Sequence, residues 1–160
     1  MTIKTGDRLP DATLHRMTPD GPEPVSVPAA FAGKRVALFS VPGAFTPTCS
    51  ARHLPGFVDK ADALRAKGID MIVGTAVNDV FVMGAWARQA EVGDKVDLLA
   101  DGNGSFVKAL GLEMDGTAYG MGTRGQRFAM VVDDGTVTHL FVEEPGAFRV
   151  SSAEHMLAQL

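Results

Sequence analysis

Two short apolar runs separated by an amphipathic segment limit most strongly what this chain can fold into. Residues 35–41 end at Pro42-Gly43, and residues 69–77 are apolar and rich in β-branched side chains, so both runs are typical of buried strands. Between the two runs, apolar side chains recur at helical spacing: Leu54, Phe57, Val58, Ala61 and Leu64. A strand, a helix and a second strand in this order predict an α/β fold.

The rest of the chain extends the same pattern. Five prolines in the first thirty residues break helices and predict short strands joined by turns. Further elements are expected as a helix from Asn78-Asp79 to about Ala90, a strand over 96–100, a helix over 103–110, a hairpin of 127–132 and 136–142, and a last helix capped by Ser152. The whole pattern predicts one domain over residues 1–160, with a central mixed β-sheet flanked by helices on both faces.

Composition narrows the classes of function. The chain has 160 residues and 16.9 kDa, the size of one domain. Its net charge is −4, and no basic run exceeds Lys34-Arg35, so neither a nucleic-acid nor an anionic-membrane surface is indicated. One cysteine cannot form an internal disulfide or a multi-cysteine zinc site. The N-terminal residues lack the apolar core of a signal peptide, so a cytoplasmic location is expected.

The junction between the first predicted strand and the first predicted helix is the segment that carries chemistry. Thr46 and Pro47 are residue types preferred at the N-cap and at the first position of a helix, which places Cys49 in the first turn. Free backbone N–H groups and the helix dipole favour an anion there, and the thiolate is the reactive form of cysteine. This end of a strand in an open α/β sheet is also a common place for an active site.

Local context leaves two interpretations of Cys49 open. A lone cysteine can be a small buried apolar residue with no chemical role. Its neighbours Thr48, Ser50 and Arg52 are polar, which favours a functional position instead. Spacing alone does not decide between a buried apolar cysteine and a reactive thiol.

Two longer motifs carry a resemblance to a known family. Residues 42–56 read Pro-Gly-Ala-Phe-Thr-Pro-Thr-Cys-Ser-x-x-His-Leu-Pro-Gly, and residues 124–135 read Arg-Gly-Gln-Arg-Phe-Ala-Met-Val-Val-Asp-Asp-Gly. The first motif is similar to the one around the reactive cysteine of peroxiredoxins, and its full length resembles the type-five, glutaredoxin-linked subfamily. The resemblance runs from about Ile3 to Leu160. It implies a thioredoxin-like fold and a thiol-dependent peroxidase that needs no metal, haem, flavin or nicotinamide.

The resemblance implies a role for each matched residue. Cys49 would attack one oxygen of hydrogen peroxide or an alkyl hydroperoxide, leaving a sulfenic acid and releasing water or an alcohol. The Thr46 hydroxyl, the Cys49 backbone N–H and the Arg127 guanidinium are the implied donors where charge develops. Arg127 would also favour the thiolate through its positive charge. Pro42 would shield the sulfur from water.

Plainer roles remain open for several of these residues. Thr46 can act only as a helix cap, which would stabilise the helix by about 1 kcal/mol. Arg127 can be a solvent-exposed residue at the end of a strand. Arg124 either braces Arg127 or lies in the loop. His53, one helical turn after Cys49, either hydrogen-bonds within the substrate pocket or is a structural or solvent-facing histidine.

A glycine-rich stretch, residues 120–125, matches the dinucleotide pattern GxGxxG. That pattern requires a preceding strand and a following helix, whereas here a strand is expected from Arg127. The glycines therefore predict a flexible loop beside the active site, and no nucleotide cofactor is expected.

A single cysteine also limits how a catalytic cycle can close. Peroxiredoxins with a resolving cysteine near the C-terminus would carry it around Ser151-Ser152, where this chain has none. The reductant must then be external: glutathione, with glutaredoxin, or thioredoxin.

The resemblance further implies a homodimer that pairs through helix starts and loops near the active site. A peroxide sensor or redox relay would have the same site and stays an alternative, whereas a non-catalytic binding module would not need Thr46, Cys49 and Arg127 together.

Overall fold

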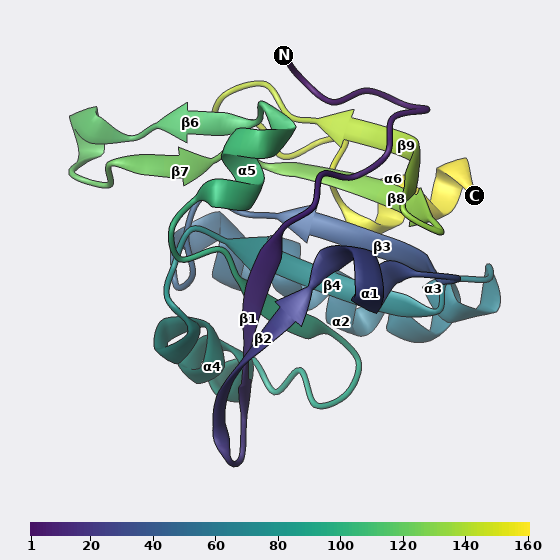
Figure 1. The fold of residues 1–160 in the computed structure, drawn as a ribbon, viewed down its shortest axis with the longest axis horizontal. Helices are drawn as coiled ribbons and strands as arrows, with labels where there is room; N and C mark the ends of the chain where they lie inside the picture. The colour runs from purple at the N-terminus through teal and green to yellow at the C-terminus, as the bar shows by residue number, and fades with distance from the viewer.

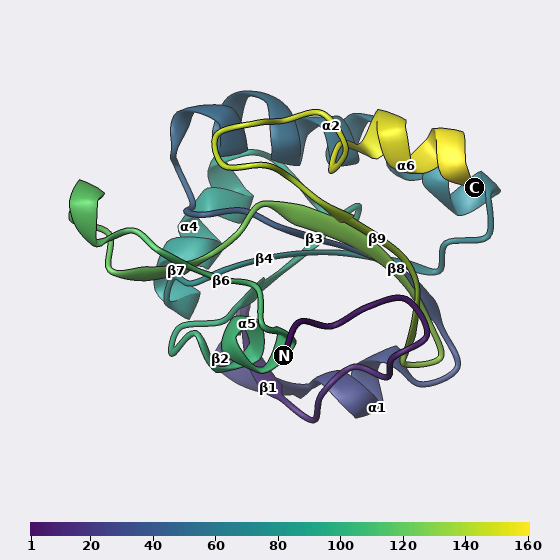
Figure 2. The ribbon, with the colours of Figure 1, turned by 90° about the horizontal axis from the view of Figure 1, so that it is seen from above.

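A seven-stranded mixed sheet forms the centre of the protein, whose computed structural model describes residues 1–160. The strand order is β2-β1-β5-β4-β3-β8-β9, and helices cover both faces of the sheet (Figures 1 and 2). None of the helices combines the length and the apolar character that crossing a membrane requires. The predicted thioredoxin-like fold, with helices on both faces of a mixed sheet, is confirmed.

The strands of this sheet are short. They are β1 (Thr13–Thr18), β2 (Gly21–Ser26), β3 (Arg35–Ser40), β4 (Met71–Ala76), β5 (Asp97–Ala100), β8 (Phe128–Asp133) and β9 (Thr136–Val142). β3 pairs in parallel with β4 and antiparallel with β8, so the two directions meet at β3. Every residue of β3 and β4 except the first is buried, as the apolar runs predict for central strands covered on both faces.

The helices divide between the two faces of the sheet. They are α1 (Val27–Phe31), α2 (Leu54–Asp59), α3 (Ala61–Ala66), α4 (Val80–Gln89), α5 (Ser105–Leu110) and α6 (Ala153–Gln159). The cluster that contains Phe57, Leu64, Trp86 and Met156 packs α2, α3, α4 and α6 against one face. A second cluster packs α1 and α5 against the other face, as Figure 2 shows.

Two predicted helix caps are confirmed. The Asp79 carboxylate accepts the N–H of Val82 at 2.8 Å, and the Ser152 hydroxyl accepts the N–H of His155 at 3.1 Å. Asn78, predicted together with Asp79 as a cap, has a different role. Its side-chain oxygen accepts the N–H of Ala44 at 2.9 Å, so it ties the loop after β3 to the start of α4.

Three expectations about local structure are wrong. A helix, α1, forms among the early prolines, because Ser26 caps it and Pro28 lies at its start, where a backbone N–H is not needed. The helix expected after Leu54 is split into α2 and α3 at Lys60, whose backbone leaves the helical conformation. The loop expected at residues 120–125 is in part a strand.

That strand belongs to a small antiparallel ribbon. β7 (Thr123–Gly125) pairs with β6 (Glu113–Asp115), and the ribbon extends away from the main sheet (Figure 1). A single 3₁₀ turn, η2 (Thr117–Tyr119), and glycines at positive φ close its tip. The GxGxxG stretch thus forms the tip and second strand of a hairpin rather than a strand-to-helix turn.

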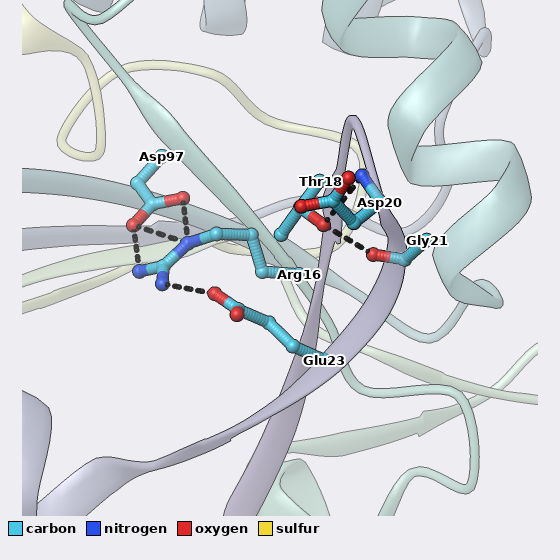
Figure 3. A network of polar contacts seen from close by, with 6 residues as sticks. All are labelled: Arg16, Thr18, Asp20, Gly21, Glu23 and Asp97. Atoms are coloured by element: carbon cyan, nitrogen blue, oxygen red, sulfur yellow. Dashed lines mark hydrogen bonds and ion pairs between the residues drawn. The ribbon is translucent and has the colours of Figure 1, made fainter.

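A polar network supports the edge of the sheet at β2, β1 and β5. β1 and β5 share only one paired position, His15 with Ala100. Arg16 adds a second link, because its Nε donates to Asp97 Oδ1 at 2.9 Å and its Nη1 donates to Glu23 at 3.1 Å (Figure 3). The hydrogen bond with Asp97 and the attraction of both carboxylates raise the pKa of Arg16 above its usual value, although burial opposes them.

Candidate active site

Cys49 lies in the first turn of the helical segment that follows β3. The helical backbone begins at Pro47, as predicted, and the Thr46 carbonyl accepts the N–H of Ser50 at 2.9 Å. The turn from Cys49 to His53 is a π-helix, η1, which places both side chains in the interior, where each is fully buried. The indole N–H of Trp86 donates to the Ser50 hydroxyl at 3.0 Å and fixes this turn against α4.

Thr46 does not use its side chain as a helix cap. Its hydroxyl lies 2.7 Å from the Gly43 carbonyl, which can only accept, so the hydroxyl proton points there. The expected capping bond is therefore absent. With its proton committed to Gly43, the Thr46 oxygen can still accept a hydrogen bond, whereas the resemblance implied a donor.

Sheet pairing brings Arg127 to the sulfur from a distant part of the chain. Ser40, the last residue of β3, pairs with Phe128, the first residue of β8. Arg127 therefore lies at the same end of these two strands as the loop that leads to Cys49. Its Nη2 donates to Cys49 Sγ at 3.1 Å. A permanent cation therefore stands in contact with the buried sulfur, where it can stabilise negative charge that develops in a reaction. The plainer role, an exposed arginine at a strand end, is excluded by this contact.

His53 bridges Arg127 and the main chain near the C-terminus. Its Nδ1 lies 2.9 Å from Arg127 Nη1, and its Nε2 lies 2.9 Å from the Ser151 carbonyl. Guanidinium can only donate and a carbonyl can only accept, so Nε2 carries the proton and Nδ1 accepts. The expectation of a solvent-facing histidine is wrong.

The environment of His53 keeps its imidazole neutral. Burial and the adjacent Arg127 cation lower its pKa from 6.5 to about 3, against the opposing effects of the Ser151 carbonyl and Glu143. Aromatic rings surround the imidazole, with Phe39 at 5.0 Å and Phe148 at 4.9 Å between ring centroids. The positive charge of the site therefore belongs to arginine and not to histidine at neutral pH.

Sequence reasoning missed three residues of this arrangement: Glu143, Phe148 and Ser151. They lie in the segment that joins β9 to α6, which runs beside α2 in Figure 2. The Phe148 ring is also 4.7 Å from the guanidinium carbon of Arg52 and 5.8 Å from that of Arg127. No local pattern marks these residues: Glu143 and Ser151 bond each other within an irregular segment, and His53, which contacts the Ser151 carbonyl, lies 98 positions away in the chain. The one signal that points to them is the burial of the Glu143 carboxylate, and this burial is visible only in the structure.

Pro42 and Arg124, two of the predicted pocket residues, contact each other. Pro42 is half-buried and lines a cavity of about 350 Å³ together with Thr48, Arg127 and residues 143–147, and with Glu113, Met114 and Gln126. Arg124 donates from Nε to the Met121 carbonyl at 2.9 Å and from Nη1 to the Pro42 carbonyl at 3.5 Å. It braces the ribbon against Pro42 and does not contact Arg127.

The site is built for chemistry at one sulfur. A buried thiol is in contact with a cation, Arg127, and the same arginine lines a cavity. No group of three or more His, Cys, Asp or Glu side chains is placed to hold a metal ion. The arrangement suits attack by a thiolate on an electrophile whose leaving atom gains negative charge.

The model of the Redoxin family matches residues 4–157. Peroxiredoxin-2E of Arabidopsis thaliana, a chloroplastic protein, is 51% identical over 163 residues, covering 99% of this chain and 70% of the relative. Peroxiredoxin-2C of Oryza sativa subsp. japonica is 48% identical over 99% of this chain and 98% of its own length. The crystal structure of reduced Prx3 from Vibrio vulnificus in complex with hydrogen peroxide superposes with a TM-score of 0.95 at 52% identity, covering 99% of both chains.

Fold and site therefore define a redoxin whose single cysteine is buried against an arginine. Within that class, the chain belongs to the peroxiredoxin family. Its relatives support a thiol-dependent peroxidase activity.

Proposed function

We propose that this protein reduces hydrogen peroxide and organic hydroperoxides through a sulfenic acid on Cys49, and that an external thiol regenerates the enzyme. The observation that carries the proposal is the contact of 3.1 Å between Arg127 Nη2 and Cys49 Sγ inside the buried first turn. The Vibrio vulnificus relative, which is described in complex with hydrogen peroxide, supports the same substrate.

In the first step, the Cys49 thiolate attacks the terminal oxygen of the peroxide. The S–O bond forms as the O–O bond breaks, the sulfur is oxidised, and the leaving hydroxide or alkoxide takes up a proton to become water or an alcohol. Arg127 stabilises the charge that develops on the leaving oxygen. The Thr46 oxygen accepts the peroxide O–H and so orients the attacked oxygen toward the sulfur.

In the second step, an external thiol condenses with the sulfenic acid to give a mixed disulfide and water. A second thiol then releases the Cys49 thiol and carries away the disulfide. Ser151 and Ser152 occupy the place where other peroxiredoxins carry a resolving cysteine, so the chain supplies no second thiol. We assign the protein to the type-five subfamily on residues 42–56, with glutathione and glutaredoxin as the reductants and thioredoxin as the alternative.

The first experiment mixes reduced protein with one equivalent of hydrogen peroxide and follows intact mass, with dimedone as a trap for sulfenic acid. Rapid, stoichiometric labelling of Cys49, absent in Cys49→Ser, is expected. A wild-type protein that stays unlabelled for minutes would refute the proposal. Tryptic mapping of the adduct confirms the labelled residue.

A second experiment separates the enzyme from a peroxide sensor. Oxidised protein is supplied with excess glutathione alone, with glutathione and glutaredoxin, or with thioredoxin, and peroxide consumption is measured. Sustained turnover with glutaredoxin is expected. Rapid oxidation of Cys49 followed by slow turnover with all three systems would instead support the relay, which hands its oxidation to a partner protein.

A homodimer and a cytoplasmic location complete the proposal. Three large aromatic side chains are exposed on the helix starts and loops through which the resemblance implies pairing: Phe45 (48%), Phe81 (64%) and Tyr119 (80%). Aromatic side chains of this size are enriched in protein interfaces. A reducing compartment such as the cytoplasm would supply the thiols that the cycle consumes.

A further inference from the structure

Glu143 directs one carboxylate oxygen at four donors. This residue follows the last residue of β9, and its Oε2 accepts the backbone N–H groups of Arg149 at 2.7 Å, Val150 at 2.9 Å and Ser151 at 2.8 Å. The Ser151 hydroxyl is the fourth donor, at 2.7 Å. Only 7% of Glu143 is exposed. Its own N–H donates to the Arg127 carbonyl at 3.0 Å.

Three successive N–H groups that converge on one point form a site for an anion. Burial alone would raise the pKa of Glu143, but the hydrogen bonds from Ser151, Arg149 and Val150 outweigh it and lower the pKa below the usual value. The residue is therefore a carboxylate at neutral pH. The proposed peroxide reaction assigns this buried charge no direct role.

A continuous chain of contacts leads from this carboxylate to the reactive sulfur. The segment that Glu143 holds presents the Ser151 carbonyl, which accepts the Nε2–H of His53 at 2.9 Å. That bond leaves His53 Nδ1 as the acceptor for Arg127 Nη1 at 2.9 Å. The other end of the same guanidinium donates to Cys49 Sγ at 3.1 Å. If the Ser151 carbonyl turned away, Nε2–H would lose its acceptor and the imidazole would no longer be held in the orientation that presents Nδ1 to Arg127.

We propose that Glu143 is a positioning residue of the peroxide reaction: it fixes the Ser151 carbonyl, which holds the His53 ring by its Nε2–H and thereby orients Arg127 on the Cys49 sulfur. The inference rests on the proposed function, because it assigns a role in the same site. Glu143 does not touch the reacting atoms. Its effect reaches them through three groups in turn: the Ser151 carbonyl, His53 and Arg127.

The principal test compares Glu143→Gln with a matched control, Asp101→Asn. Asp101 is also a buried carboxylate, 4% exposed, and it accepts the N–H groups of Phe106 and Val107 at 3.1 and 3.0 Å, away from Cys49. The rate constant for oxidation by hydrogen peroxide is measured by the fluorescence of Trp86, and stability is measured by urea unfolding. We expect both variants to lose stability and only Glu143→Gln to react more slowly, on the order of tenfold. A wild-type rate constant in Glu143→Gln, or an equal loss in Asp101→Asn, overturns the proposal.

A double-mutant cycle tests whether the effect passes through His53. In a His53→Gln background, Glu143→Gln should slow oxidation by less than about twofold, because the link it supports is already lost. A loss of about tenfold in both backgrounds would show that Glu143 acts independently of His53, which contradicts the proposed route.

A spectroscopic test does not depend on peroxide chemistry. ¹H–¹⁵N NMR of the wild type should show a His53 Nε2–H that exchanges slowly with solvent, and Glu143→Gln should show faster exchange of the same proton. Identical exchange rates overturn the inference. A wild type that fails to consume peroxide refutes the proposed function, yet this exchange rate still decides whether Glu143 holds His53.

A milder variant keeps the test open should Glu143→Gln fail to fold. Ser151→Ala removes only the hydroxyl donor and leaves the three backbone N–H groups in place. We expect oxidation to slow by about twofold to fivefold together with a smaller increase in the exchange rate of the His53 Nε2–H. An unchanged rate constant and an unchanged exchange rate would overturn the proposal.

Discussion

His53 and Arg127 share a hydrogen bond of 2.9 Å in which the imidazole is the acceptor. Because guanidinium stays protonated at every accessible pH, the imidazole must stay neutral to accept from it. The cation that contacts Cys49 Sγ is therefore the guanidinium, and the imidazole beside it carries no charge. This division between a fixed cation and a neutral acceptor leads directly to two of the predictions below.

Replacing Arg127 by alanine should slow the reaction with hydrogen peroxide by roughly 10²–10³-fold, the scale of losing one preorganised donor to a developing oxyanion. The rate constant is measured by stopped-flow fluorescence of Trp86, which lies against the cysteine turn. Arg149→Ala, which removes an exposed positive charge from the neighbouring loop, serves as the control and should react at nearly the wild-type rate. Normal reactivity of Arg127→Ala would mean that its contact with the sulfur has no part in catalysis.

Acid should destabilise the protein through His53. The pKa of this residue is about 3 in the folded state and 6.5 as a model value for the unfolded chain, so between these limits the unfolded chain binds one more proton. The contribution of His53 to the free energy of unfolding is therefore complete above pH 6.5. As the pH drops from 6.5 toward 3, this contribution falls by about 1.4 kcal/mol per pH unit.

Urea unfolding of the wild type and His53→Gln measures this slope. The interval from pH 6.5 to 5 is the most informative, because it lies above the usual range of carboxyl groups. His53→Gln should have a flatter dependence there, whatever its absolute stability. Parallel curves for the two proteins would contradict a neutral, buried His53.

Thr46→Val should slow peroxide oxidation, because it removes the oxygen that accepts the peroxide O–H and also the bond of 2.7 Å to the Gly43 carbonyl. Thr46→Ser keeps the hydroxyl and should preserve most of the rate. The loss in Thr46→Val should be on the order of tenfold or more, as for a displaced reacting group. A fully active Thr46→Val would leave the hydroxyl with no catalytic role.

Phe81→Glu should convert the proposed dimer to a monomer. This side chain lies at the start of α4 with 64% of its surface exposed, and a charge placed in an interface core is unfavourable. Sedimentation velocity of the wild type and the variant at several concentrations measures the change. Glu91→Gln, an exposed position just after the same helix, is the control. A wild type that sediments as a monomer at every concentration would refute the dimer.

Local patterns were sufficient for much of the fold and for the position of the nucleophile. The apolar runs that became β3 and β4, the caps Asp79 and Ser152, and the helix start at Pro47 all depend on a few neighbouring residues. The predictions of helices and strands failed where contacts with other parts of the chain outweighed local conformational preference. Ser26 and Pro28 began a helix in a segment expected to contain none, and residues 120–125 joined a ribbon because β6 was available to pair with them.

Residues close together in the chain set the α/β order of elements, the place of Cys49 in the first helical turn and the family motif around it. Which groups meet the sulfur depends instead on contacts between distant parts of the chain. Arg127 reaches it because β3 pairs with β8, and His53 becomes an acceptor because the Ser151 carbonyl lies on its other side. Hydrogen bonds of this kind join residues 74 to 98 positions apart, so sheet pairing and the need to satisfy buried polar groups set them, and no local pattern records them.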